Sequence, residues 1–407
     1  MANVSSSNGI EKYPKLRFPE FTEPWTETQL TNLFKKNTKK NNDGSVTNVI
    51  SNSAKNGLIP QKDYFDKDIA NADNTAGYYI IRKNDFVYNP RKSTDAPYGP
   101  ISRYTYSDDG IVSPLYLCFR GNDNINPYYF EKYFKSSAWH RYIYMSGDRG
   151  ARHDRVSIKD ETFFEMPINL PCEYEQDKIA TFLSVLEHKI EKQAALVDNL
   201  KKYKRGVINK LINEISLEGT QCNFAELVTI QRGGSPRPID DYITDESDGI
   251  NWIKIGDVGA DSLYITKTKE RIKSSGAKKS RKVYPDDLIL SNSMSFGRPY
   301  IMKIDGCIHV GWLLIRDKNE FFDKKFLCYY LASDNVLSQY RRFAAGSCVS
   351  NLNSELVGNL QIVLPSMEQQ NKCASIFEKI DSCVLNAVKQ YEHLCQIKKG
   401  LQQQLFI

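Results

Sequence analysis

Apolar positions in two long stretches of the chain recur at alternating steps of four and three residues. This is the heptad pattern of a helix that packs against another helix along its whole length. Both stretches are therefore predicted to be long helices. The apolar seam residues are Ile179, Leu183, Leu186, Ile190, Val197 and Leu200 in the first stretch, and Phe377, Ile380, Val384, Tyr391 and Leu394 in the second.

The second stretch is a copy of the first. Pro171 and Gln176 fall on Pro365 and Gln370 when the chain is shifted by 194 residues (365 minus 171), and no gap is needed. A chain of 407 residues that repeats at this interval consists of two copies of one unit. The same shift places Leu33 on Leu227, so the repeat includes a short opening helix, which Leu30, Leu33 and Phe34 are expected to line.

The long helices have two interpretations. Each could be the core helix of its own domain. However, about forty residues of helix extend about 60 Å at about 1.5 Å per residue, which is longer than a small domain is wide. We therefore expect the two copies to pack together as an antiparallel coiled coil. The polar rungs of the seam, at Gln193, Lys204 and Lys398, would then help to set its register.

The regions between the helices have a different pattern. Short apolar runs alternate with turns rich in Gly, Asn and Asp, which predicts strands joined by loops. These two regions resemble each other far less than the helices do, apart from their ends. The predicted fold is α+β, with two globular α/β domains separated by two long helices that form an antiparallel coiled coil, and with an internal pseudo-twofold repeat. Its parts are a flexible lead-in (1–20), a first domain (21–170), a central helix (171–215), a second domain (216–364) and a C-terminal helix (365–407).

Composition excludes several classes of protein. No run of eighteen apolar residues is present, so no membrane span is expected. The nine cysteines never form a C-x-x-C pair, which argues against a zinc cage or a disulfide framework and favours a cytoplasmic protein. The net charge of +6 permits binding to nucleic acid through local patches without requiring it.

Motifs for catalysis are missing. The sequence contains neither a phosphate-binding GxxxxGK[ST] loop nor a GxGxxG motif after a strand, and its five histidines are scattered without ligand spacing. Asn89-Pro90-Arg91 is interpreted as a strand end running into a turn. Pro285-Asp286-Asp287 is interpreted as a turn before a strand, because no acid-x-Lys motif follows it. We expect no catalytic residue, no metal site and no cofactor in this chain.

Basic residues interleaved with aromatic residues are more informative. They occur in Gly- and Ser-rich loops of both predicted domains, where they suit phosphate neutralisation and, for arginine, guanine recognition. Any one of them could simply be a solvated surface residue, but two such sets in equivalent domains favour DNA. The candidates are Arg91, Lys92, Arg103, Arg141, Arg149, Arg152 and Arg155 in the first domain, and Arg232, Arg237, Lys278, Lys279, Arg281, Arg298, Arg341 and Arg342 in the second.

Taken in order, these parts resemble the specificity subunit of type I restriction–modification enzymes. The resemblance rests on the two helices with an E-Q-x-K-I-A-like opening, the preceding I-x-L-P ends, the N-terminal Y-P-K-L-R-F-P-E-F-x-x-x-W, and G-G-S-P followed by N-W-I-K-I-G-D-V. It implies two target recognition domains, each reading half of a split site in double-stranded DNA, and helices that set the spacer. It also implies two methyltransferase subunits and restriction subunits as partners. These partners would carry S-adenosylmethionine, ATP and Mg, and would perform adenine methylation and ATP-dependent cleavage.

Two other classes remain as alternatives. The chain could be an interaction scaffold, a coiled-coil rod with two protein-binding domains, whose DNA binding would be absent or insensitive to salt. It could instead be a self-sufficient nuclease or methyltransferase, which the missing motifs argue against.

Overall fold

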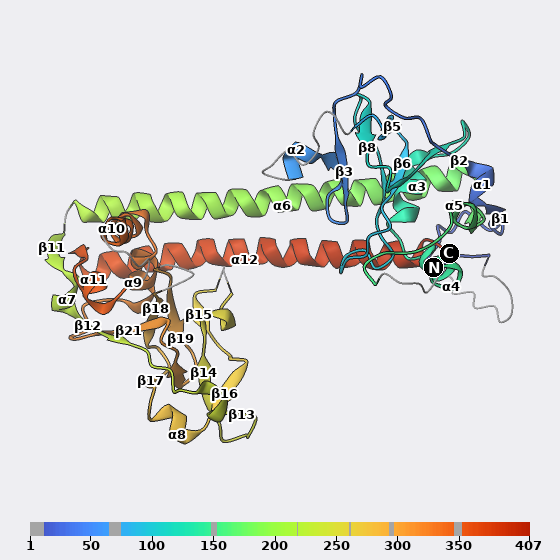
Figure 1. The fold of residues 1–407 in the computed structure, drawn as a ribbon. Helices are drawn as coiled ribbons and strands as arrows, with labels where there is room; N and C mark the ends of the chain where they lie inside the picture. The colour runs from blue at the N-terminus through green and yellow to red at the C-terminus, as the bar shows by residue number, and fades with distance from the viewer. Residues whose placement is uncertain are drawn as a thin grey trace. The chain divides into compact units, whose positions relative to one another are not determined.

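The fold was obtained as a computed structural model that describes residues 12–64, 75–147, 153–217, 219–259, 262–292, 297–345 and 352–407. The chain divides into two compact units. Unit 1 comprises Met1–Gln193 and Gln390–Ile407, and unit 2 comprises Ala194–Lys389. Each unit holds one globular domain and a part of each long helix (Figure 1).

The two predicted long helices are present as α6 (Glu173–Ser216) and α12 (Met367–Gln404). They begin at positions 194 residues apart. The side chain of Gln176 donates a hydrogen bond to the Pro171 carbonyl at 2.9 Å, and Gln370 does the same to Pro365 at 3.1 Å. The repeat seen in the sequence therefore extends to individual hydrogen bonds.

Within each unit the two helices pair in opposite directions. In unit 1, Gln193 of α6 hydrogen-bonds Gln390 of α12 at 3.3 Å, while the earlier Glu187 meets the later Lys398 at 2.8 Å. In unit 2, Lys204 forms an ion pair with Asp381. The expected antiparallel pairing is thus confirmed inside each unit. Of the predicted seam residues, Ile179, Leu183, Val197, Phe377 and Val384 are buried, and Leu186, Ile190, Leu200, Ile380, Tyr391 and Leu394 are half-buried.

The domain of unit 1 is a mixed α/β fold. Its helices are α1 (Leu30–Leu33), α2 (Gln61–Tyr64), α3 (Pro127–Phe134), α4 (His140–Ser146) and α5 (Asp160–Phe164). Its strands are β1 (Thr26–Gln29), β2 (Phe34–Lys36), β3 (Ile50–Ser53), β4 (Gly57–Pro60), β5 (Tyr79–Ile81), β6 (Phe86–Tyr88), β7 (Ile101–Arg103), β8 (Gly110–Val112), β9 (Leu117–Gly121) and β10 (Pro167–Leu170). The opening helix is one turn long, and Phe34, expected to line it, begins strand β2 instead.

The domain of unit 2 has a similar order of elements. Its helices are α7 (Phe224–Leu227), η2 (Ile239–Asp241), η3 (Ile255–Asp257), α8 (Ser274–Ala277), α9 (Lys324–Leu331), α10 (Asp334–Ala345) and α11 (Ser354–Gly358). Its strands are β11 (Thr220–Asn223), β12 (Val228–Arg232), β13 (Ile243–Thr244), β14 (Ile250–Ile253), β15 (Tyr264–Ile265), β16 (Glu270–Ile272), β17 (Arg281–Val283), β18 (Leu288–Ser291), β19 (Pro299–Met302), β20 (Gly306–Ile308), β21 (Trp312–Asp317) and β22 (Gln361–Leu364).

Each domain is closed by a two-stranded antiparallel ribbon. In unit 1, β1 pairs with β10 and Thr26 lies opposite Leu170; in unit 2, β11 pairs with β22 and Thr220 lies opposite Leu364. Both positions of the second pair are 194 residues after those of the first. The first and last strands of each domain are therefore neighbours, in the same register in both repeats.

The central sheets of the two domains have a common strand order, although their sequences differ. The order is β2-β9-β6-β7 in unit 1 and β12-β21-β18-β19 in unit 2, where β15 adds a fifth strand beside β19. In unit 1, Arg120 forms a two-pronged ion pair with Asp85 (2.5 and 2.7 Å); in unit 2, Arg316 does so with Asp287 (2.8 and 2.6 Å). Asp286 has a left-handed backbone (φ 69°) in the turn just before Asp287 and β18, which confirms the turn expected at Pro285-Asp286-Asp287.

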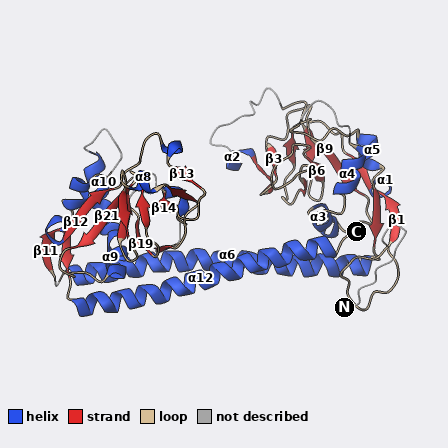
Figure 2. Ribbon diagram, turned by 90° about the horizontal axis from the view of Figure 1, so that it is seen from below, coloured by secondary structure: helices blue, strands red, loops and turns tan. Residues whose placement is uncertain are grey.

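The long helices contribute to the core of each unit. Leu183 of α6 and Phe406, just after α12, belong to the aromatic-rich core of unit 1; Ile212 of α6 and Phe377 of α12 belong to that of unit 2. In unit 2, helix α9 lies between the sheet and the long helices (Figure 2). Among the helices that the structure describes, none has a stretch long and apolar enough to cross a bilayer.

Candidate nucleic-acid interface

In unit 2, four of the predicted basic residues gather where β12 ends beside α8 and β17. Arg281 Nε lies 3.5 Å from the Arg232 carbonyl oxygen, and Lys279 Nζ donates to the hydroxyl of Tyr242 at 2.5 Å. Lys278 is exposed directly after the short helix α8. All four charged side chains are exposed, so their positive charge is available to an anionic partner.

Two glycines allow this surface to form. A Cβ on Gly233 would lie 2.2 Å from the His309 carbonyl oxygen, and one on Gly234 would lie 2.9 Å from the Lys279 carbonyl oxygen. The Gly234 amide donates to the Ile308 carbonyl at 3.1 Å, and the Ser280 hydroxyl donates to the Gly234 carbonyl at 2.7 Å. Only residues without a side chain bring the β12 loop this close to the basic segment.

The remaining candidates of unit 2 lie elsewhere or are partly engaged. Arg237 is exposed on the loop after the two glycines. Arg298 is half-buried with its guanidinium 5.5 Å from the centre of the Tyr300 ring. Arg341 and Arg342 are exposed on α10, which lies beside the long helices, whereas α8 lies at the far end of the domain from them (Figure 1). The predicted set therefore does not form one continuous surface.

In unit 1, a backbone pairing brings three predicted residues together. Arg91 and Arg155 form an antiparallel bridge, and the Lys92 amide donates to the Asp154 carbonyl at 2.8 Å. Burial raises the pKa of the Tyr116 phenol, and the nearby guanidiniums of Arg155 and Arg91 oppose that rise. Both arginines therefore lie close to the same ring, although they are 64 residues apart in the sequence (155 minus 91).

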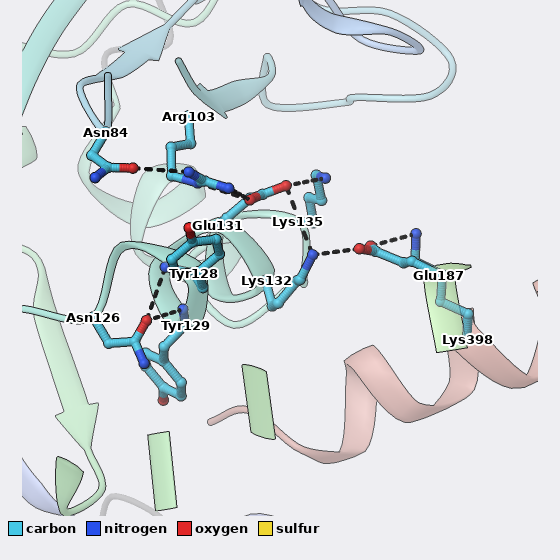
Figure 3. Close-up of polar contacts among 10 residues, drawn as sticks. All are labelled: Asn84, Arg103, Asn126, Tyr128, Tyr129, Glu131, Lys132, Lys135, Glu187 and Lys398. Carbon is cyan, nitrogen blue, oxygen red and sulfur yellow. Dashed lines mark hydrogen bonds and ion pairs between the residues drawn. The ribbon is translucent and has the colours of Figure 1, made fainter. Parts of the chain in front are cut away.

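Arg103 is engaged inside the domain. Its guanidinium contacts Glu131 at 2.6 and 2.8 Å and Asn84 at 2.8 Å, and lies 4.4 Å from the centre of the Tyr128 ring (Figure 3). Only 8% of its side chain is exposed. The sequence grouped Arg103 with surface arginines because Tyr104 and Tyr106 follow it, but its donors are used within unit 1.

Three further candidates complete the set. Arg141 is exposed on α4. Arg149 and Arg152 lie outside the described residues.

Sequence reasoning missed two lysines of unit 1. Lys39 and Lys40 lie in the loop after β2, as Gly233 and Gly234 lie in the loop after β12, and both lysines are exposed. The Lys39 carbonyl accepts from the Ile80 amide at 2.8 Å, and Lys40 forms a bridge with Tyr79 of β5. In sheet order and chain order β5 corresponds to β17, the strand of Arg281. The 194-residue shift from Phe34 to Val228 was the signal that could have identified them.

The described residues hold no cluster of three or more His, Cys, Asp and Glu side chains suited to a metal ion. Both domains carry exposed cations on loops around a central sheet, an arrangement suited to binding an anionic surface.

Residues 23–202 and 223–396 match the family described as type I restriction modification DNA specificity domain. These two ranges cover most of the chain, one for each copy of the repeat. The chain belongs to this family.

Two curated members of similar sequence come from Methanocaldococcus jannaschii. The type I restriction enzyme MjaVIII specificity subunit is 25% identical over 283 residues, which cover 60% of this chain and 62% of that protein. The putative type I restriction enzyme MjaX specificity subunit is 23% identical over 310 residues, covering 70% of this chain and 68% of the relative. The match to the first relative thus spans less than two thirds of its length.

Solved structures share the fold. A chain of a type I R-M system, studied for its complex assembly and conformational transition, superposes with a TM-score of 0.61 at 15% identity, covering 93% of this chain and 96% of that one. The S subunit of a type I restriction–modification system from M. genitalium superposes with a TM-score of 0.52 at 16% identity, covering 97% and 99%. The predicted fold class, with two repeated α/β domains and long helices, is thereby confirmed.

Proposed function

We propose that this chain is the DNA-specificity subunit of a type I restriction–modification enzyme, in which each domain reads one half of a split site. One observation carries the proposal: the two repeats keep the same helix contacts and ribbon register, whereas their exposed basic loops differ. Equal helices suit identical partner subunits, and unequal loops suit two different half-sites.

Phosphate contact is the chemistry that the loops support best. The cluster of Arg232, Lys278, Lys279 and Arg281 carries four exposed cations beside the backbone of the Gly233–Gly234 loop. In unit 1, Arg91, Lys92 and Arg155 supply a second group. Contacts to phosphates give affinity and orientation, and neighbouring loop side chains then read base edges.

Partner subunits would supply the catalysis. Two methyltransferase subunits would dock on the two repeats, with restriction subunits outside them, in the cytoplasm. S-adenosylmethionine, ATP and Mg would belong to those subunits, and this chain would carry no catalytic residue and no cofactor. The absence of catalytic motifs from the sequence supports this division.

The test is methylome sequencing of cells that express the chain with its cognate methyltransferase subunit, with and without residues 228–364 exchanged for another domain. We expect a split, adenine-methylated motif in which one half changes on the exchange. A methylome that does not depend on the chain would refute the proposal and favour the interaction scaffold. DNA binding that does not weaken with added salt would point the same way.

A further inference from the structure

Each unit contains a three-residue contact that joins its domain to both long helices. In unit 1, Glu187 of α6 contacts Lys398 of α12 at 2.8 Å and also forms an ion pair with Lys132 of α3 (Figure 3). We call this contact anchor 1. A single carboxylate therefore ties together three elements that are far apart in the sequence.

The contact recurs in unit 2, where it is called anchor 2. Asp381 of α12 accepts a hydrogen bond from Tyr329 of α9 at 2.6 Å and forms an ion pair with Lys204 of α6. The two acids are 194 residues apart (381 minus 187), and so are the two lysines of the long helices (398 minus 204). The domain residue has changed from Lys132 to Tyr329, while the position of the contact has been kept.

The anchors differ in how far they extend into the domain. In unit 1, Glu131 links Lys132 to Lys135 and to Arg103 of β7, which makes a continuous charged path from the sheet to α12 (Figure 3). In unit 2, Ile301 of β19 holds the register position of Arg103: it pairs with Leu288 of β18 as Arg103 pairs with Phe86 of β6. The path in unit 2 thus ends at Tyr329.

Burial strengthens anchor 1. Lys132 is only 4% exposed and Glu187 is 19% exposed, so water screens their interaction weakly. The apolar contacts around Leu183 hold the domain on the helix, but apolar attraction is itself non-directional. Charge-assisted hydrogen bonds are short and depend on angle. Glu187 binds both Lys132 of the domain and Lys398 of the opposite helix. The domain is therefore held at one position along the helix pair.

We propose that anchors 1 and 2 fix the angle of each recognition domain on its helix pair and thereby restrict the DNA spacer that the subunit accepts to one length. This rests on the proposed function. One base pair of spacer corresponds to about 3.4 Å of rise and about a tenth of a helical turn. A domain that is free to tilt on its helices accommodates that change; an anchored domain does not. Glu187 and Asp381 are positioning residues and touch no base.

The experiment compares the methylomes of cells expressing the full chain with its methyltransferase subunit. The variants are Glu187→Gln and Asp381→Asn, which keep side-chain shape and remove the charge. The matched control is Glu191→Gln, because Glu191 is 77% exposed on the same helix and pairs with its neighbour His188 at 3.7 Å. If the anchors act in this way, the variants should read the same half-site bases. The number of methylated sites whose spacer is one base pair longer or shorter should rise about tenfold, the size expected for loss of one charge-assisted hydrogen bond.

A graft separates positioning from stability. The double variant Lys132→Tyr with Glu187→Asp installs the groups of anchor 2 in unit 1, and it should restore a single spacer length. Variants that keep one spacer at normal methylation would overturn the proposal, and so would a change in the bases read.

A second readout does not depend on the proposed function. Hydrogen exchange of the Glu187→Gln chain should accelerate in α3 while the β2-β9-β6-β7 sheet keeps its protection. Exchange that accelerates throughout the domain would mean general unfolding and would overturn a positioning role. A wild-type chain that directs no split motif would refute the proposed function, and the exchange data would still decide whether the anchor exists.

Discussion

Lys398 Nζ of α12 lies 2.8 Å from Glu187 Oε1 of α6, and the matching pair in the other repeat joins Lys204 of α6 to Asp381 of α12. Each helix therefore gives one acid to its own repeat and one lysine to the other. The pairing uses the same heptad position twice, which favours the native register over a slipped one.

Removing the carboxylate of Glu187 should destabilise unit 1. Glu187→Ala leaves Lys132, which is 4% exposed, without its partner on α6. Because Glu131 stays 3.8 Å from Lys132, the cost should lie below the about 3–5 kcal/mol expected for a fully unpaired buried charge. Urea unfolding measures the loss, and Glu191→Ala on the exposed face should leave the midpoint close to that of the wild type. Equal midpoints for both variants would contradict the prediction.

The two helix-start glutamines should differ in their effect on stability. Gln176→Ala loses the hydrogen bond to Pro171, worth about 1 kcal/mol. Gln370→Ala also removes the acceptor of the Asp323 amide and the donor to the Phe321 carbonyl, so it should cost more, about 2–3 kcal/mol. Denaturant unfolding of the two variants provides the comparison, and a larger loss for Gln176→Ala would be inconsistent with these contacts.

The Gly233 backbone should be intolerant of a side chain. Gly233→Ala places a Cβ 2.2 Å from the His309 carbonyl oxygen, and relief by backbone movement costs about 1–3 kcal/mol. The displaced loop should also weaken DNA binding. Gly256→Ala is the control, because a Cβ there meets no atom within 4 Å. Thermal unfolding and DNA titration of both variants test this, and equal behaviour of the two would refute it.

Acid should weaken unit 1 over a defined range of pH. Burial raises the pKa of Glu131, but Lys135, Lys132 and Arg103 outweigh it and lower the pKa from 4.5 to about 2. A lowered pKa stabilises the folded state above pH 4.5, and this contribution, about 3 kcal/mol, is lost as the pH falls towards 2. Unfolding measured between pH 5 and 2.5 should have a shallower pH dependence in Glu131→Gln. An identical slope in variant and wild type would contradict this.

The basic cluster of unit 2 should determine part of the salt dependence of DNA binding. Changing Arg232, Lys278, Lys279 and Arg281 to Gln should reduce the slope of log affinity against log salt by up to about 0.9 for each phosphate contact removed. Arg205→Gln is the matched control, because its guanidinium is exposed but paired with Asp334 at 2.8 Å. A slope that changes as much in the control would exclude a specific role for the cluster.

Sequence predicted the features that repeat and missed those that depend on tertiary contact. The heptad steps and the 194-residue shift predicted α6, α12 and the pairing of their ends, because periodicity is a local property of the chain. The domain limits inferred from the sequence stay predictions. The common strand order of the domains was hidden because Asp85 and Asp287 are 202 residues apart (287 minus 85), so the shift drifts where loops differ in length.

The candidate site was predicted less well than the fold. The residues around Arg103 have the composition of a surface loop. Its burial depends on Glu131, which comes from another element. Lys39 and Lys40 lacked the aromatic neighbours used as a signal. The sequence identified one residue of each anchor, because Lys204 and Lys398 were recognised as polar rungs of the seam. Their acids, Glu187 and Asp381, fell outside the apolar ladder, so only the folded chain showed the pairs.

The ribbons that close the domains have a consequence for how the chain can vary over generations. Because Thr26 lies opposite Leu170, and Thr220 opposite Leu364, everything between these positions is in effect one long loop with fixed ends. The entropy of closing such a loop grows only slowly with its length. Recombination within these bounds can therefore lengthen, shorten or replace the intervening segment while the ribbons and helices keep their geometry.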